Sequence, residues 1–419
     1  MNIQLARVLF YALFLTASFA AGAETTVLRA ARILDVDSGK MITPGVVVID
    51  DNHISAINPA GMPAGATVVE LPGITLLPGL MDMHTHLTSD MSEGWLYREV
   101  ETTPVDDVLL GVKYAKITLL AGFTTVRDVG SRGFTDVSLM RAIDAGTVDG
   151  PRIIPAGYAI GITGGHCDVT GYAPGIAERG PEQGVADGKD EILKAVRYMV
   201  KHGVKVIKTC ATAGVLSLEG SPGAQQYSDE ELRVLVEEAH RHELKVAAHA
   251  HGTQGIIAAS NAGVDSIEHG SILNKEAIAT LKKNGTWLVP TLFQWFLHYD
   301  LPPLMDQKNE YVKSFVSKSM RDAFKAGVKV AFGTDAGAGP HGRNAEEFAA
   351  YVDHGMSPID AIRTATINAA EMMDIKDRGR IQPGLLADIV GVSGSPLDNI
   401  RIMEDVKFVM KDGKVYKQP

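Results

Sequence analysis

The middle of this 419-residue chain alternates between short apolar runs and longer stretches with helical periodicity. Near-continuous apolar strands separated by helices are typical of a parallel sheet that is buried on both faces. Eight such strands in roughly 260–300 residues match the size of a (β/α)8 TIM barrel. The eight runs lie between residues 74 and 337 and read ITLLPGLMDMHTHL, FTTVRDV, RIIPAGYAI, VKVIKTCA, KVAAHAHG, VDSIEHG, TWLVPTL and KVAFGTDAG.

The two ends of the chain have a different pattern, in which short β-like runs are joined by tight turns. VVVID and HISAI flank the turn signal Asp51-Asn52, and VKFVMKDGKVYK contains the turn signal Asp412-Gly413. The sequence therefore predicts an α/β protein with two parts. Residues 80–375 would form the (β/α)8 barrel, and residues 24–79 and 376–419 would together form a small, discontinuous β-sandwich domain.

The first residues resemble an export signal. Arg7 places a positive charge before the apolar stretch Val8 to Ala20, and Ala21-Gly22-Ala23 is a small-residue cleavage site. We expect a signal peptide over residues 1–23, with an uncleaved N-terminal anchor as the alternative. The apolar stretch is shorter than the ~20 residues of a transmembrane helix, and no later segment reads as a membrane span. The mature protein is expected to be periplasmic or secreted, without stable membrane insertion.

Charge and cysteine content add two constraints. The chain carries 40 Lys and Arg against 50 Asp and Glu, a formal net charge of −10. An acidic chain without a basic run is a poor nucleic-acid binder, so we expect no nucleic-acid partner. The two cysteines, Cys167 and Cys210, could form a disulfide in an oxidising compartment, but the sequence leaves this open.

Polar side chains end five of the eight predicted strands. His84 and His86 are two residues apart, so both imidazoles point to the same side of the first strand. Packing alone does not explain such a distribution, and imidazole and carboxylate ligands suit Zn²⁺ or a related divalent ion. The sequence therefore predicts a metal site at the barrel mouth. Its candidate ligands are His84, His86, Lys208, His249, His251, His269 and Asp335.

Lys208 has a separate interpretation. A lysine at the core-facing end of a strand is uncommon, because burying an ammonium group is costly. One explanation is a side chain that extends to reach water. The other is an amine with a lowered pKa that adds CO2 and becomes a carbamate, which carries a charge of −1 and two oxygens and can bridge two cations.

These motifs resemble the amidohydrolase superfamily over residues 26–419. Within that superfamily, they are most similar to the imidazolonepropionase-related branch with binuclear, carboxylated-lysine sites. The resemblance implies that His84, His86 and Asp335 bind one metal ion, that His249 and His269 bind a second, and that a carbamate on Lys208 bridges them. His251 is the alternative to His249 as ligand. The matching segments, in chain order, are HTHL, GFTTVRDVG, VKVIKTCATAG, HAHG, SIEHG, FGTDAG, ATINAAEMM and ADIV.

The resemblance also implies an activity. Members of this branch hydrolyse Xaa-Pro, Xaa-Arg or Xaa-Lys dipeptides, N-acyl amino acids or ochratoxin-type amides. We therefore expect a metal-dependent hydrolase with two divalent ions, Zn²⁺ being the usual choice. A hydroxide that bridges the metals would attack the amide carbonyl, Asp335 would move the proton to the leaving amine, and a C-terminal amino acid would be released. The alternatives are hydrolysis of cyclic amides or lactones at the same site, and a metal-binding protein without activity.

Substrate contacts are predicted on the loops. His166, in GITGGHCD, resembles a Gly-Gly-His whose histidine holds the substrate near the scissile bond, and it is counted with Asp335 and Lys208 as catalytic. Tyr227 resembles a tyrosine that contacts the substrate carboxylate. His251 and His341 could also face the substrate, and relatives that form large homo-oligomers imply a homo-oligomer here.

Overall fold

The computed structural model describes residues 25–419, and the predicted signal peptide lies outside that range. Two parallel sheets form the barrel wall, one of three strands in the order β6-β7-β8 and one of four in the order β12-β11-β10-β9. Their strands are β6 (Leu80–Thr85), β7 (Phe123–Asp128), β8 (Arg152–Pro155), β9 (Val206–Cys210), β10 (Lys245–Ala250), β11 (Ser266–His269) and β12 (Trp287–Val289).

Short parallel bridges join the two sheets into a closed barrel. On one side, Ile160 pairs with Thr209 of β9. On the other, the extended segment 330–336 takes the place of the eighth strand: Val330 pairs with Leu288 of β12, and Ala336 pairs with Thr85 of β6. The predicted α/β fold with a TIM barrel is confirmed. The segment 330–336, in the position of the eighth strand, is too irregular to count as a strand.

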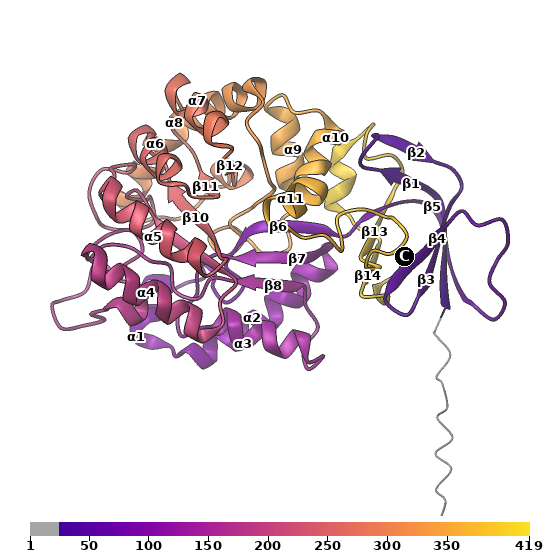
Figure 1. The fold of residues 1–419 in the computed structure, drawn as a ribbon, viewed down its shortest axis with the longest axis horizontal. Helices are drawn as coiled ribbons and strands as arrows, with labels where there is room; N and C mark the ends of the chain where they lie inside the picture. Colours follow the sequence, from indigo (N-terminus) through magenta and orange to yellow (C-terminus); the bar gives the residue numbers. More distant parts are fainter. Residues whose placement is uncertain (1–24) are drawn as a thin grey trace, which may run out of the picture.

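Helices surround this barrel, as Figure 1 shows. Their apolar faces explain the packing: in α5, Ser228 caps the first turn, and Leu232, Leu235 and Val236 are buried. The helices are α1 (Arg98–Glu101), α2 (Pro104–Leu120), α3 (Thr135–Asp144), α4 (Gly188–His202), α5 (Asp229–Arg241), α6 (Thr253–Ala262), α7 (Lys275–Asn284), α8 (Pro303–Ala326), α9 (Glu346–Asp353), α10 (Pro358–Arg363) and α11 (Ala369–Met372).

The two chain ends meet in a separate β domain beside the barrel (Figure 1). They form one eight-stranded sheet in the order β15-β14-β13-β5-β1-β3-β4, with β2 paired to β1. The sheet curls around a single apolar core, and β4 reaches Leu385 and Leu386, which precede β13. Its strands are β1 (Thr25–Asp35), β2 (Lys40–Ile42), β3 (Gly45–Asp50), β4 (His53–Ile57), β5 (Thr67–Pro78), β13 (Ile389–Ser393), β14 (Phe408–Lys411) and β15 (Lys414–Lys417).

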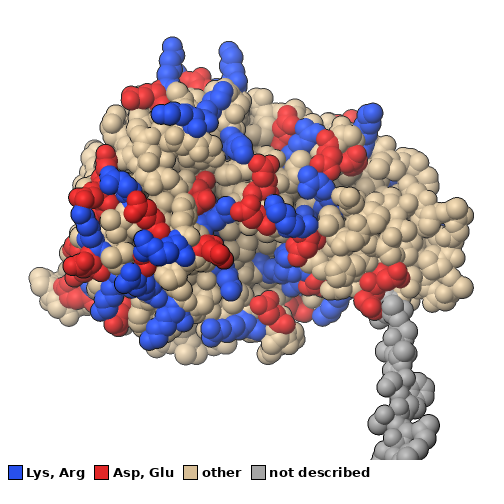
Figure 2. Space-filling view, in the orientation of Figure 1, with Lys and Arg blue, Asp and Glu red and all other residues tan. Residues whose placement is uncertain are grey.

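The surface carries charges of both signs. Basic and acidic side chains are interspersed over the barrel face in Figure 2, without a broad patch of either sign. Within residues 25–419, no helix is both long enough and apolar enough to cross a bilayer.

A buried ion pair connects the barrel to the β domain. Arg152 of β8 contacts both carboxylate oxygens of Asp388, and Asp388 also accepts a hydrogen bond of 2.9 Å from the Asp412 backbone N–H. The Asp388 side chain is 2% exposed, so this carboxylate depends on these donors for its solvation.

We expect Asp388→Ala to lower the free energy of unfolding by about 2 kcal/mol, because it leaves Arg152 partly buried without its main partner. The loss is smaller than for a fully buried pair because Arg152 still contacts Asp412. Thermal and urea unfolding would measure it. The control Glu70→Ala removes an ion pair whose side chains are 49% and 57% exposed, and should cost below about 0.5 kcal/mol. Equal losses in the two variants would contradict the prediction.

Candidate metal centre

The strand ends converge on a pocket of about 510 Å³ at the C-terminal mouth of the barrel. In parallel strands, residues two apart face the same way, so Lys208 follows Val206 and His249 follows Ala247 into the barrel interior. The pocket wall includes eight of the residues predicted from the sequence: His84, His86, His166, Lys208, His249, His251, His269 and Asp335.

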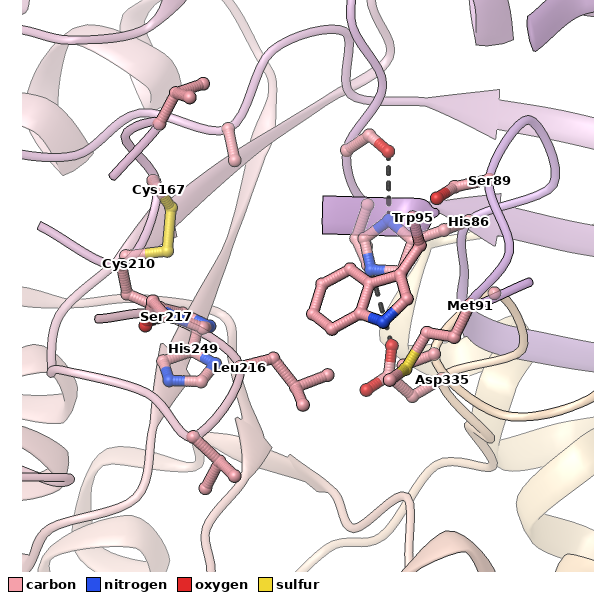
Figure 3. A pocket seen from close by; sticks show the side chains of 18 of the residues that line it. His86, Ser89, Met91, Trp95, Cys167, Cys210, Leu216, Ser217, His249 and Asp335 are labelled. Atoms are coloured by element: carbon pink, nitrogen blue, oxygen red, sulfur yellow. Dashed lines mark hydrogen bonds and ion pairs between the residues drawn. A yellow bond between two sulfur atoms is a disulfide. The ribbon is translucent and has the colours of Figure 1, made fainter. Parts of the chain in front are cut away.

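His84, His86 and Asp335 form the tightest group. The Asp335 Oδ1 atom lies 3.5 Å from His84 Nε2 and 3.4 Å from His86 Nε2. One ligand-capable atom from each residue lies within 4.8 Å of the other two. Figure 3 shows His86 and Asp335 together on one wall of the pocket. Two imidazole nitrogens and a carboxylate oxygen that converge in this way fit a divalent transition-metal ion.

The opposite nitrogen of each imidazole is occupied, which fixes the tautomer. His84 Nδ1 donates to Glu268 Oε2 over 2.7 Å, and His86 Nδ1 donates to the Gly130 carbonyl over 2.9 Å. In the neutral form of each imidazole, Nε2 therefore carries the lone pair that a metal ion needs, because a neutral imidazole has one donor and one acceptor nitrogen.

Glu268 is itself held by a buried guanidinium. Arg127 Nη2 donates to Glu268 Oε1 over 2.7 Å, and Arg127 Nε donates to the Met83 carbonyl over 2.6 Å. Burial raises the pKa of Glu268, but Arg127 and the His84 hydrogen bond outweigh burial and lower the pKa to about 2. Glu268 is therefore a permanent carboxylate that orients His84.

Three further imidazoles lie beside this group. The ring centroid of His269 is 4.9 Å from that of His84, 4.8 Å from His249 and 5.0 Å from His251. The Nδ1 atoms of His269 and His251 form hydrogen bonds of 2.8 Å with Thr291 and Ser271. Burial lowers the pKa of all three imidazoles, so they are neutral at neutral pH and can act as ligands.

Within residues 25–419, buried groups without a hydrogen-bond partner lie near these imidazoles, the Trp295 indole N–H among them. His249 Nε2 is buried without a hydrogen bond. The Lys208 amine, on a residue 4% exposed, forms neither a hydrogen bond nor an ion pair. Burial lowers the pKa of Lys208 to about 8, against the opposing effect of Glu268 and Asp335. Buried polar atoms are nearly always paired, so the His249 nitrogen indicates a ligand that the protein atoms do not supply, and Lys208 lines the same cavity.

A disulfide fixes the loop that carries His166. Cys167 is bonded to Cys210 of β9, with their Cα atoms 5.8 Å apart, which resolves the possibility left open by the sequence. Figure 3 shows this bond beside His249 and Ser217. The His166 ring centroid lies 4.1 Å from that of His249, and His166 Nδ1 is 2.6 Å from Ser217 Oγ. Burial lowers the pKa of His166 to about 4, so it is neutral at neutral pH.

Gly214 makes room for that histidine. A Cβ atom at this position would lie 2.1 to 2.4 Å from three atoms of the His166 ring, far inside van der Waals contact. The glycine therefore allows the loop after β9 to pass directly beneath the imidazole.

The backbone is strained at three strand ends around the pocket. His269, Thr291 and Asp335 have φ angles of 69°, 48° and 59°, in the left-handed region that non-glycine residues rarely adopt. Gln294 supports two of these positions, because its Nε2 lies 3.1 Å from both Thr291 Oγ1 and Asp335 Oδ2. Strain of this kind is kept where it places functional side chains.

Two of the predicted substrate contacts lie elsewhere. Tyr227 is 1% exposed, and its hydroxyl donates to the Ala186 carbonyl over 2.8 Å, so it is a core residue away from the pocket wall. His341 stacks on Tyr114, and its Nε2 is 2.8 Å from the Ser89 carbonyl. It supports the loop after β6 and does not line the cavity. Sequence patterns place these residues on loops but give no side-chain direction.

Three residues that support the candidate site were not predicted from the sequence. Arg127 and Gln294 serve the ligands as described, and Lys308 of α8 donates to the carbonyls of Gly214 and Ser217 over 3.1 and 2.8 Å. Arg127 could have been suspected, because an arginine in the middle of the apolar run FTTVRDV must find a buried partner. The loop and helix positions of Gln294 and Lys308 carry no such signal.

The fold and this ligand set define the class of protein: a (β/α)8 barrel enzyme with a candidate metal centre at the C-terminal ends of its strands.

Comparison with known proteins identifies the family. The amidohydrolase family model matches residues 75–416. Ochratoxinase from Aspergillus niger is 31% identical over 428 aligned positions, which cover 95% of this chain and 88% of the fungal protein. The crystal structure of a Xaa-Pro dipeptidase with methionine in its active site is 37% identical, with a TM-score of 0.89, and covers 94% of this chain and 100% of that chain. A prolidase complexed with N-methylphosphonate-L-proline is 30% identical, with a TM-score of 0.86 and the same two coverages.

The chain therefore belongs to the amidohydrolase family. It is a hydrolase that acts on carbon–nitrogen bonds.

We expect Glu268→Gln to weaken metal binding by about 10- to 100-fold, because a neutral amide no longer enforces the His84 tautomer that presents Nε2. Chelator competition, followed by metal analysis of the recovered protein, would measure this affinity. The control Glu371→Gln removes a 62% exposed carboxylate on α11 and should leave the affinity unchanged. A folded Glu268→Gln protein with wild-type affinity would contradict the orienting role.

Proposed function

We propose that this protein is a binuclear metal-dependent amidohydrolase that cleaves a peptide-like amide bond and releases a C-terminal amino acid. The observation that carries the proposal is Lys208, a buried residue that lines the pocket among the candidate ligands. With a pKa of about 8, roughly a tenth of this amine is neutral at pH 7 and able to add CO2. The resulting carbamate would supply the anionic oxygens that a second cation requires.

The residues divide between two metal positions. One ion would be held by His84, His86 and Asp335. The other ion would be held by His249 and His269. Carboxylated Lys208 would bind both ions. His249 Nε2 is buried without a hydrogen bond, and the resemblance to the superfamily selects His249 over His251 as the ligand. Bound there, two divalent ions, with Zn²⁺ as the expected species, would polarise the substrate carbonyl and lower the pKa of water.

The protein's own groups would handle the proton and the substrate. Asp335 would take a proton from the attacking water and deliver it to the leaving amine. Gln294, which contacts Asp335 Oδ2, would hold the carboxylate in position for both transfers. His166 is neutral, lies against His249 and lines the pocket, so it is placed to donate a hydrogen bond to the substrate near the scissile group.

The comparisons support an amide substrate. Ochratoxinase, a Xaa-Pro dipeptidase and a prolidase all resemble this chain over nearly its full length. Hydrolysis of cyclic amides or lactones by the same groups is the second candidate.

The metal-replete enzyme should release free amino acids from linear N-acyl amino acids or dipeptides, and should act much more slowly on hydantoins and lactones. Mass spectrometry of products from a mixed library would detect both. The EDTA-treated enzyme is the control, because it tests whether the activity depends on metal. Turnover confined to the cyclic compounds would favour the second candidate instead.

Lys208→Ala should lower both the bound metal and the activity, the latter by roughly 100-fold or more, because the carbamate that joins the two positions cannot form. A short-chain carboxylic acid should restore part of both, since its carboxylate can occupy the vacated space. Lys208→Arg keeps the charge but cannot form a carbamate, and should not be rescued. Lys283→Ala, on the exposed surface of α7, is the control. Full metal content and activity in Lys208→Ala would overturn the binuclear proposal.

We also propose that the protein is exported and forms a homo-oligomer. The Cys167–Cys210 disulfide supports an oxidising compartment such as the periplasm or the cell exterior. An intact Met1 on the protein recovered from its natural host would contradict signal cleavage, and light scattering of the purified protein would measure the oligomeric state.

A further inference from the structure

The outer part of the pocket differs chemically from the metal centre beneath it. Loops after β6, β9 and β12 bring apolar side chains to the wall of the cavity, and we refer to this part as the outer pocket. Figure 3 shows Trp95 and Met91 on the same wall as His86 and Asp335, while Leu216 extends from the opposite wall beside His249. The apolar residues of the outer pocket are Met91, Trp95, Leu96, Leu216, Leu218 and Leu301.

Charged groups also line the outer pocket, but they neutralise one another. Arg98 pairs with Asp90. Arg132 Nε lies 2.5 Å from Asp107 Oδ2, and Arg179 Nη2 lies 2.8 Å from Glu99 Oε1. These three arginine side chains are only 13 to 16% exposed, so their pairing is shielded from water.

The fourth acidic residue of this wall is also occupied. Asp168 accepts backbone hydrogen bonds of 2.8 Å from Gly164 and 2.7 Å from Val169. Within residues 25–419, every arginine and acidic residue that lines the outer pocket therefore has a partner. A charged group of the substrate would lose its water here and find every arginine already paired and the one remaining carboxylate, Asp168, already engaged by two backbone N–H groups, which is an unfavourable exchange.

We propose that the outer pocket selects a bulky, uncharged apolar group of the substrate, aromatic or long aliphatic, and discriminates against basic and acidic side chains. This rests on the proposed function, because it assumes that the scissile amide lies at the metal centre. A cavity of about 510 Å³ is large enough for an amino acid and a bulky substituent together. Burial of that substituent against leucine, methionine and tryptophan provides the affinity.

Leu218 and Leu96 are the residues best placed to test this selection. Their side chains lie at the pocket wall and are 43% and 38% exposed, so a polar substitution at either position does not disturb the core. They come from different loops, after β9 and after β6, and provide two independent variants.

The experiment compares kcat/KM of the metal-replete full chain on N-acetyl and N-(2-naphthoyl) conjugates of Phe, Leu, Arg and Glu. We expect the naphthoyl conjugates of Phe and Leu to be the best substrates, and the Arg and Glu conjugates to be at least tenfold poorer. Arg or Glu conjugates that match or exceed Phe would overturn the selection for uncharged groups. If no conjugate is hydrolysed, the proposed function itself fails, and the two failures are thereby distinguished.

Leu218→Glu and Leu96→Glu place an unpaired carboxylate at the wall, and either should raise the Arg-to-Phe ratio of kcat/KM at least fivefold. Leu218→Gln controls for size and polarity without charge, and Val68→Glu makes the same type of change on β5 of the β domain. Val68→Glu should leave the ratio unchanged, and Leu218→Gln should change it less than Leu218→Glu does. An unchanged ratio in both glutamate variants, with folding intact, would contradict the assignment of this wall to substrate selection.

Discussion

The hydrogen bonds and ion pair of the buried Glu268 carboxylate are the interactions on which the candidate metal centre depends. Glu268 lies on β11 and accepts hydrogen bonds from Arg127 of β7 and His84 of β6. One side chain therefore connects three strands across the barrel interior. A buried charge is tolerated only when its partners are complete, and here they are supplied by two strands that the chain reaches more than 140 residues earlier. The same contact fixes the His84 tautomer. The contacts of Glu268 that join these strands therefore also orient a candidate metal ligand, His84.

Around this centre the protein combines two kinds of rigidity. The strand ends are held by hydrogen bonds and strained backbone, as at Asp335, whose φ of 59° is supported by Gln294. The loops are held from outside: the Cys167–Cys210 disulfide anchors the segment that carries His166, and Lys308 of α8 donates to two carbonyls of the loop after β9. Candidate ligands at the strand ends and a proposed substrate contact on a fixed loop fit the general arrangement of (β/α)8 barrels, in which strand ends and loops carry the site.

The outer pocket differs from the metal centre in how its charged groups are paired. Each of its three arginines is paired with an acid, and leucine, methionine and tryptophan side chains line the wall beside them. The inner pocket, by contrast, contains the unpartnered groups, Lys208 and His249 Nε2. Paired charges in the outer pocket and an unpartnered imidazole nitrogen in the inner pocket suit a substrate whose reacting amide is polar and whose flanking group is not.

The sequence by itself determined the barrel and the residues at its strand ends, because apolar runs that alternate with helices admit few folds and because strand parity fixes which side chains face inward. It also placed both chain ends in one β domain. Only the tertiary structure decided which loop side chains reach the pocket. Tyr227 and His341 turn to the Ala186 and Ser89 carbonyls, while Arg127, Gln294 and Lys308 support the site. Only the tertiary structure showed that Cys167 and Cys210 form a disulfide. Strands have a two-residue period that can be followed along the chain, whereas a loop side chain takes its direction from contacts with residues distant in sequence.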